Sequence, residues 1–278
     1  MKLITFDDGR VGRLELEENL VIELDVHSTR TYFELEGKVA ETGERLAYSE
    51  VRLRAPIVPK KFFHTAGNFA AHHEELEKVN WSHPVHKGIV FFQNVDAIIG
   101  PDDDIVYPDH LTKEMDYELE LAIIIGKSGK FFGPDEADDY IAGFTVFNDI
   151  SARDIQRKEM ESGVFSFSKG IDTFCPIGPW IVTADELPPG ATGLRICTRV
   201  NGETMQDSNT SDMIFSTANV VATLSEFMTL EPGDLIATGT PSGVAHARKP
   251  PAWMKAGDTV EVEVEGIGVL SNPIVDET

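Results

Sequence analysis

Short apolar runs rich in Val, Ile and Phe recur along most of the chain and are separated by Gly, Pro and Asp. Runs of this kind predict β-strands bounded by turns. The predicted strands cover residues 11–16, 20–24, 60–66, 89–93, 117–125, 141–148, 180–183, 195–200, 235–238 and 259–264. Composition predicts helices at residues 69–79, 152–162 and 216–228. Because strands and helices do not alternate regularly, we expect an α+β fold that is mostly β.

A domain boundary is predicted at residues 55–59, where two prolines bias the residues before them away from helix. Ahead of this connector, the strands at 11–16 and 20–24 flank a turn and predict a hairpin. We therefore expect a small β-rich N-terminal domain over residues 1–58 and a larger domain over residues 59–278.

Composition and charge narrow the functional classes. The formal charge of −23 argues against nucleic acid as a partner, because its phosphates would be repelled. No run approaches the roughly 20 apolar residues of a membrane span. Acidic residues interrupt the N-terminus before any signal core, so we expect a cytoplasmic protein. The two cysteines, Cys175 and Cys197, are too few for a disulfide framework and are expected to be buried thiols.

The first candidate site is a pair of glutamates, Glu118 and Glu120, at the start of a strand that continues as an apolar run. Side chains two residues apart on a strand point to the same face. Two adjacent, poorly hydrated carboxylates need a proton or a cation between them. Hard oxygen ligands favour Mg²⁺, Mn²⁺ or Ca²⁺ over zinc. The alternative is a strand edge that faces water.

Asp149 extends this candidate site, since it follows the apolar strand at 141–148 and precedes the predicted helix at 152–162. A carboxylate at the end of a buried strand is suitable as a third ligand. The alternative is capping of the helix by Asp149 or Ser151. An acidic protein attracts an anionic substrate only at a local positive centre, and a bound cation would supply one.

Six segments, in the same order, resemble the fumarylacetoacetate hydrolase family between Lys60 and Pro273. They are Glu118-Leu119-Glu120, Asn148-Asp149-Ile150-Ser151-Ala152-Arg153-Asp154-Ile155-Gln156, Asp172-Thr173-Phe174-Cys175-Pro176-Ile177-Gly178-Pro179-Trp180, Met228-Thr229-Leu230-Glu231-Pro232-Gly233-Asp234, Thr238-Gly239-Thr240-Pro241-Ser242-Gly243-Val244 and Glu265-Gly266-Ile267-Gly268. The resemblance implies a mixed β-roll catalytic domain that forms a homodimer. It also implies Mg²⁺ or Mn²⁺, with Ca²⁺ as a substitute in crystals, on the two glutamates and the aspartate, which here are Glu118, Glu120 and Asp149.

The resemblance also assigns residues around the metal. The family's characteristic lysine falls on Lys169, and its substrate-binding positions are matched to Gln156, Arg153, Thr240 and Gly239. Taken alone, Lys169 would be interpreted as an exposed side chain. The resemblance implies that it acts in catalysis.

Residues 67–75 resemble the segment that supplies a His–Glu pair on a mobile lid helix in the hydrolytic members. The predicted pair is His72 and Glu75, which are three residues apart on a helix and can meet. A carboxylate beside an imidazole raises its basicity, as general-base catalysis requires. His73 and Glu74 compete for the assignment, and a solvated helix face is the alternative.

Two departures from the family concern substrate selection. Gln93 stands where members often carry a lysine, and the loop at residues 80–87 has an uncommon pattern with Trp81, His83 and His86. A zinc site that includes these histidines has no strict spacing to support it.

The resemblance implies hydrolysis of a C–C bond in a 2,4-dioxo acid, giving a 2-oxo acid such as pyruvate and a carboxylic acid, in the catabolism of aromatic or related compounds. The small 2-oxo acid would bind the metal, His72 would activate water and Lys169 would stabilise the oxyanion. Isomerisation of a 2-hydroxy-dienedioate or decarboxylation of oxaloacetate at the same site is the alternative. A catalytically silent binder of 2-oxo acids is a further class.

Overall fold

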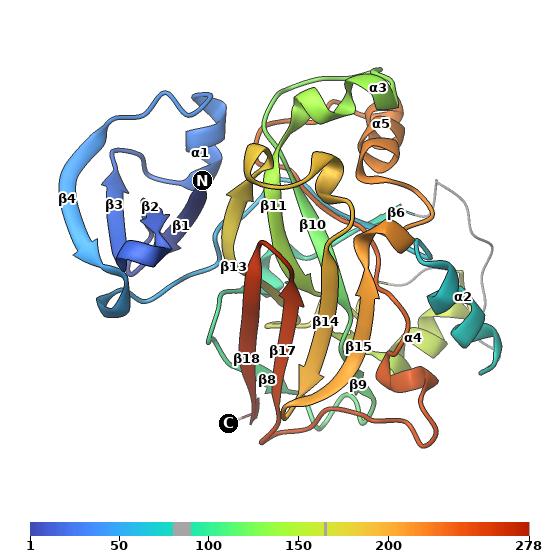
Figure 1. Ribbon diagram of the computed structural model, residues 1–278. Coiled ribbons are helices and arrows are strands. Elements are labelled where there is room, and N and C mark those ends of the chain that lie inside the picture. The colour runs from blue at the N-terminus through green and yellow to red at the C-terminus, as the bar shows by residue number, and fades with distance from the viewer. Residues whose placement is uncertain (80–89, 164–165, 278) are drawn as a thin grey trace.

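The computed structural model of the protein describes residues 1–79, 90–163 and 166–277. Two large β-sheets form its body (Figure 1). Within these residues the larger sheet has eleven strands in the order β4-β3-β2-β1-β13-β11-β10-β16-β5-β6, with β7 paired to β13. The second sheet has the order β15-β14-β17-β18-β8, and β12 pairs with β9. The fold is therefore α+β and mostly β, as the sequence predicts.

The strands are β1 (Lys2–Phe6), β2 (Arg10–Glu15), β3 (Leu20–Leu24), β4 (Glu41–Ala47), β5 (Phe62–Thr65), β6 (Val90–Phe92), β7 (Ile98–Ile99), β8 (Ile105–Tyr107), β9 (Met115–Asp116), β10 (Leu119–Ile125), β11 (Ile141–Asn148), β12 (Ser151–Ala152), β13 (Cys175–Thr183), β14 (Arg195–Val200), β15 (Glu203–Asn209), β16 (Leu235–Ala237), β17 (Thr259–Val264) and β18 (Gly268–Asp276). The α-helices are α1 (Thr29–Glu34), α2 (Ala70–Glu77), α3 (Pro134–Ala137), α4 (Arg153–Met160) and α5 (Thr217–Phe227).

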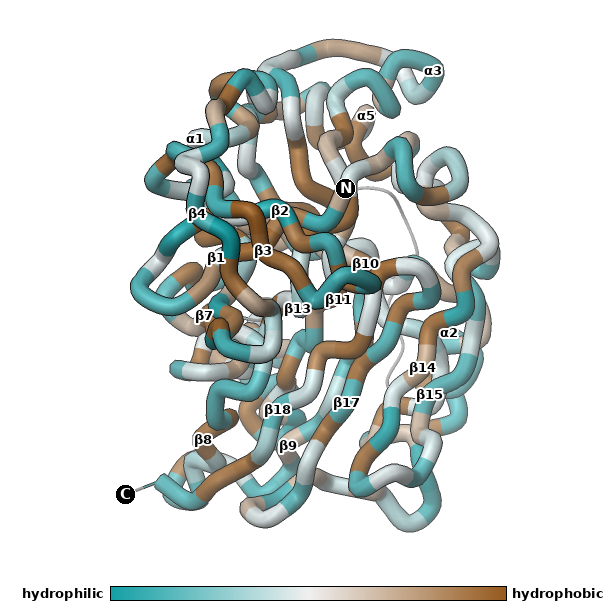
Figure 2. The backbone as a smooth tube through the Cα atoms, turned by 60° about the vertical axis from the view of Figure 1, so that its left-hand side comes forward, coloured by the Kyte–Doolittle hydropathy of each residue, from teal (hydrophilic) through white to brown (hydrophobic). Residues whose placement is uncertain are grey.

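All ten predicted strands and all three predicted helices correspond to observed elements, with shifted ends. The pattern does not predict β4, because its residues are polar and mostly exposed and therefore carry no apolar periodicity. Figure 2 shows this contrast, with β4 mainly hydrophilic beside the hydrophobic β3. The predicted loop at residues 80–88 lies outside the described residues.

The apolar run of β10 reflects burial on both faces of the strand. Leu121 and Ile123 pack into the core cluster that includes residues of the second sheet, whereas Ala122 and Ile124 pack into a cluster on the opposite side. A strand covered on both faces has no polar face to present, so its sequence becomes continuously apolar. The glutamates that precede this run consequently lie at the edge of a core and not on a wet surface.

The N-terminal strands β1–β4 and helix α1 form a lobe beside β13 (Figure 1). They extend the larger sheet, because β1 pairs with β13 through Leu3 and Ile181. The sheet is therefore continuous between this lobe and the rest of the chain. The division at residue 58 stays a prediction.

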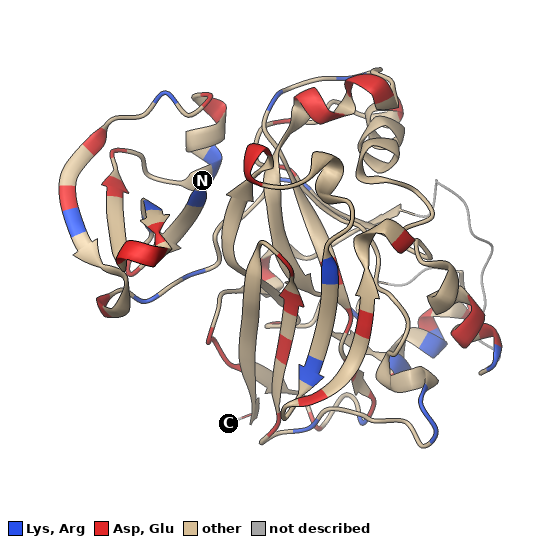
Figure 3. Ribbon diagram, viewed as in Figure 1, with Lys and Arg blue, Asp and Glu red and all other residues tan. Residues whose placement is uncertain are grey.

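Acidic side chains are spread over the N-terminal strands, α3 and β17 (Figure 3), so the charge of −23 is not confined to one segment. Within the described part of the chain, no helix has the length and apolar character needed to cross a membrane. Cys175 and Cys197 are free and buried, as predicted.

Candidate active site

The antiparallel register of β10 and β11 brings the predicted carboxylates together. Leu119 pairs with Asn148, so the next residues outward, Glu118 and Asp149, lie opposite each other. The Asp149 N–H donates to the Glu118 carbonyl at 2.8 Å, and the Glu118 N–H donates to Asn148 Oδ1 at 3.1 Å. These bonds hold the start of one strand against the end of the other.

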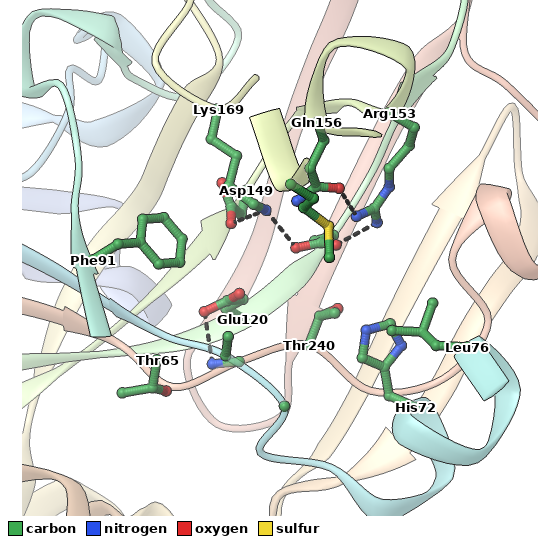
Figure 4. A pocket seen from close by; sticks show the side chains of 15 residues that line it. Thr65, His72, Leu76, Phe91, Glu120, Asp149, Arg153, Gln156, Lys169 and Thr240 are labelled. Atoms are coloured by element: carbon green, nitrogen blue, oxygen red, sulfur yellow. Dashed lines mark hydrogen bonds and ion pairs between the residues drawn. The ribbon is translucent and has the colours of Figure 1, made fainter. Parts of the chain in front are cut away.

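Nine of the ten predicted site residues line one pocket (Figure 4). They are His72, Glu118, Glu120, Asp149, Arg153, Gln156, Lys169, Gly239 and Thr240. The tenth, Glu75, is hydrogen-bonded to His72. Glu118 and Glu120 therefore share a pocket, as their spacing predicts.

Lys169 is a buried cation at the centre of the carboxylates, with 3% of its surface exposed. Its ammonium donates to Glu118 Oε2 at 2.8 Å, to Ser151 Oγ at 2.7 Å and to Asp149 Oδ2. Burial alone would lower the pKa of Lys169, but the charges of Asp149 and Glu118 outweigh it and the pKa is raised. The expectation of an exposed lysine from composition is wrong here, because Lys169 is buried and lines the pocket, and the catalytic role that the resemblance implies stays a prediction.

Arg153 is the second buried cation. Its guanidinium donates to Asp116 at 2.8 Å, to Glu118 and, through Nη1, to Gln156 Oε1 at 2.9 Å. Burial raises the pKa of Glu118, but Arg153 and Lys169 more than compensate and hold it below its usual range. Direct substrate contact by Arg153 stays a prediction, while the structure gives its guanidinium three protein acceptors.

The loop after β16 contacts Glu120 and the start of β10. The Gly239 N–H donates to Glu120 Oε2 at 2.7 Å. The Thr240 hydroxyl accepts a hydrogen bond from Gln206 Nε2 at 2.9 Å. Gln206 also accepts the Leu119 N–H at 3.1 Å, so one amide joins this loop to the start of β10.

On helix α2, His72 Nδ1 lies 2.8 Å from Glu75 Oε1, as the predicted pairing requires. Glu75 Oε2 accepts the Gly243 N–H at 2.8 Å, which ties the helix to the 239–243 loop. Figure 4 shows His72 facing the pocket from the α2 side. His73 instead lies 3.5 Å from Glu77 and does not line the pocket. The geometry thus favours His72 and Glu75 over His73 and Glu74.

His64, on β5, joins the site although no motif in the sequence marks it. His64, Glu120 and Asp149 each offer a ligand atom, and these atoms lie within 4.8 Å of one another. All three residues are buried. The parallel pairing of β5 with β16, which places His64 opposite Ala237, could not be read from the sequence.

Asp116 and Gln93 hydrogen-bond to the two buried cationic residues of the site, Arg153 and Lys169. Asp116 accepts the Arg153 guanidinium and the Ala245 N–H, and it is fully buried. Gln93, where the family often has a lysine, donates to the Lys169 carbonyl at 2.9 Å. The uncommon loop with Trp81, His83 and His86 lies outside the described residues.

The charges of the pocket fit a divalent cation. Counted as ionised, the buried carboxylates of Asp116, Glu118, Glu120 and Asp149 outnumber the two buried cations, which gives a formal charge of −2. Burial, Asp149 and Glu118 together raise the pKa of Glu120 well above its usual value. Asp149 Oδ1 is buried and has no hydrogen-bond partner in the described structure. A divalent ion would balance the charge and satisfy this oxygen.

Known proteins resemble this chain in sequence and in fold. The family model described as "Fumarylacetoacetate (FAA) hydrolase C-terminal" matches residues 61–275. A mitochondrial oxaloacetate tautomerase of Bos taurus is 44% identical over 232 residues, which cover 83% of this chain and 71% of the relative.

Two solved structures extend the comparison over the whole chain. The 5-carboxymethyl-2-hydroxymuconate delta-isomerase of Mycobacterium smegmatis is 36% identical with a TM-score of 0.82, and all of both chains is covered. The maleylpyruvate hydrolase of Sphingobium sp. SYK-6, solved in complex with manganese(II) and pyruvate, is 28% identical with a TM-score of 0.80, again over all of both chains. The protein is an enzyme with a buried site for a divalent metal, and the chain belongs to the fumarylacetoacetate hydrolase family.

Proposed function

We propose that the protein is a divalent-metal-dependent tautomerase that interconverts the keto and enol forms of a small 2-oxo dicarboxylic acid, with oxaloacetate as the first candidate. The observation that supports it is one pocket that combines a negatively charged cation site with an imidazole held by a carboxylate. The names of the related tautomerases and of the related isomerase favour this chemistry over the C–C bond hydrolysis predicted from the sequence.

Glu120 and Asp149 would hold the ion, together with Glu118 as predicted from the sequence. When bound, a divalent ion supplies Lewis-acid polarisation of a 2-oxo acid, and hard oxygen ligands suit Mg²⁺ or Mn²⁺. The manganese in the related hydrolase structure supports this choice.

The protein's own groups orient the substrate. Arg153 donates a hydrogen bond to the side-chain oxygen of Gln156. The amide NH2 of Gln156 is therefore the group that can donate to a substrate carboxylate. The Lys169 ammonium is fixed by three acceptors beside the pocket. Its positive charge stabilises the negative charge that develops on the 2-oxo oxygen during enolisation. Because the ammonium is already in place, the site does not have to reorganise during the reaction.

His72 is the group that moves the proton. Because Glu75 accepts a hydrogen bond from Nδ1, Nε2 is the nitrogen that exchanges a proton with the substrate. In enolisation, C3 of the 2-oxo acid gives a proton to His72 Nε2, the 2-oxo oxygen takes up a proton from water, and His72 releases its proton back to water. Ketonisation is the reverse, so no atom is gained or lost overall.

The test is the rate of ketonisation of enol-oxaloacetate, followed by the loss of its ultraviolet absorbance, in Mg²⁺, in Mn²⁺ and in EDTA. We expect acceleration with either ion and a fall of at least about 10²-fold on chelation, since Lewis-acid stabilisation contributes several kcal/mol. Acylpyruvates and hydroxymuconate-type dioates are assayed in parallel. No acceleration with any of these acids in the presence of metal would reject the proposal.

Hydrolysis of an acylpyruvate-like substrate is the second candidate function. The specific observation in its favour is the His72–Glu75 pair, whose geometry also suits general-base activation of water. Release of pyruvate together with a carboxylic acid from an acylpyruvate would establish it. Double-bond migration without such products would leave tautomerisation or isomerisation as the reaction.

Replacement of His72 by alanine is expected to lower ketonisation by about 10²–10⁴-fold, the usual contribution of a positioned acid–base group. Mn²⁺ affinity, measured by calorimetry, should stay close to that of the unmodified protein. His73→Ala is the matched control, because the neighbouring imidazole lies outside the pocket, and it should retain full activity. A loss confined to His73→Ala would instead assign the proton transfer to the competing histidine.

A further inference from the structure

His64 is a buried histidine to which no step of the proposed reaction has been assigned. It lies on β5 with no exposed surface, and its Nδ1 is 3.2 Å from Asp149 Oδ2. An ionised carboxylate only accepts hydrogen bonds, so Nδ1 carries the hydrogen when this bond forms. His64 therefore offers Asp149 an Nδ1–H donor.

The surroundings of the ring leave Asp149 as its polar partner. Aromatic rings pack around it, with centroid distances of 4.8 Å to Phe62, 4.6 Å to Phe91 and 5.2 Å to Phe147. Nε2 is buried and has no hydrogen-bond partner among the described residues. A ring enclosed in this way has little rotational freedom, so its Nδ1–H is a fixed donor.

The two oxygens of Asp149 differ in their environment. Oδ2 accepts from both His64 and Lys169, whereas Oδ1 is buried and has no hydrogen-bond partner among the residues that the structure describes. Two fixed donors on one oxygen set the plane of the carboxylate and leave the other oxygen for an ion. Partners of this kind orient metal ligands and raise their affinity for the ion.

We propose that His64 is a positioning residue of the metal centre, which holds Asp149 with Oδ1 directed at the ion and does not itself bind the ion. This inference rests on the metal dependence of the proposed function. Direct coordination by Nδ1 would move the hydrogen to Nε2, where the described structure offers no acceptor. Metal-bound histidines almost always donate that second N–H to an acceptor.

The experiment compares the full-length protein with His64→Phe and His64→Asn, and titrates each with Mn²⁺ and with Mg²⁺ by calorimetry. His64→Phe removes the donor but keeps a ring among the three phenylalanines, and we expect it to weaken binding of both ions by about 10–100-fold. His64→Asn keeps an amide donor near the position of Nδ1 and should lose less than about tenfold. Similar losses for both ions are expected, because positioning does not depend on the preference of an ion for nitrogen.

Electron spin-echo spectroscopy of the Mn²⁺-loaded unmodified protein supplies a second measurement that needs no variant. Absence of a directly coordinated histidine nitrogen is the expected result. A coordinated nitrogen, or His64→Phe binding both ions as tightly as the unmodified protein, would overturn the inference. Failure of the unmodified protein to bind either ion would count against the proposed function instead, so the two failures are distinguishable.

Discussion

Asp149→Asn is expected to lower metal-dependent turnover by about 10³-fold or more, because a bound ion contributes several kcal/mol of stabilisation that the variant cannot recruit. Asparagine has nearly the same shape as aspartate, so the change removes the charge without removing the packing. The pocket then carries one negative charge fewer, and its net charge no longer matches a divalent ion. Mn²⁺ titration by calorimetry, together with the ketonisation assay, measures both consequences.

Asp154→Asn is the matched control for this substitution. Asp154 lies in the first turn of α4, accepts hydrogen bonds from the Thr112 hydroxyl and the Lys113 N–H, and does not line the pocket. It should keep its metal affinity and turnover. If Asp149→Asn binds Mn²⁺ as tightly as the unmodified protein, the ion is held elsewhere and the assignment of Asp149 is wrong.

The carboxylate cluster could be predicted because it depends on local order along the chain. Glu118 and Glu120 share a face by strand spacing, and the apolar runs that follow and precede the carboxylates mark buried strands. The structure adds the reason that Glu118 and Asp149 meet, which is the pairing of Leu119 with Asn148. Pairing register is a long-range property, and the apolar pattern of two strands buried on both faces does not specify it.

The residues that contact these carboxylates were harder to predict from the sequence. His64 and Gln206 come from β5 and β15, strands that are remote in sequence and pair with β16 and β14. Neither residue has a neighbour in the sequence that signals a polar role. Lys169 was recoverable only through resemblance, because a single lysine in a turn has no periodicity. The order of the strands in the sheets, which brings these residues to the site, cannot be read from the sequence pattern.

Lys169→Met is expected to destabilise the metal-free protein by about 3–5 kcal/mol, the usual cost of removing one partner from a buried ion pair. The ammonium serves Glu118, Asp149 and Ser151, and its loss leaves carboxylates close together without their shared donor. Urea unfolding in EDTA measures the change. Lys158→Met, on the outer face of α4, is the control and should stay within about 0.5 kcal/mol.

The same variant should respond to metal more strongly than the unmodified protein. With all four carboxylates counted as ionised, loss of Lys169 changes the formal charge from −2 to −3, and a divalent ion then brings it to −1. Saturating Mn²⁺ should therefore recover part of the lost stability, while turnover stays about 10²–10³-fold low because the charge that stabilises the developing oxyanion is absent. A deficit in unfolding free energy that Mn²⁺ leaves unchanged would show that the ion and Lys169 do not share these carboxylates.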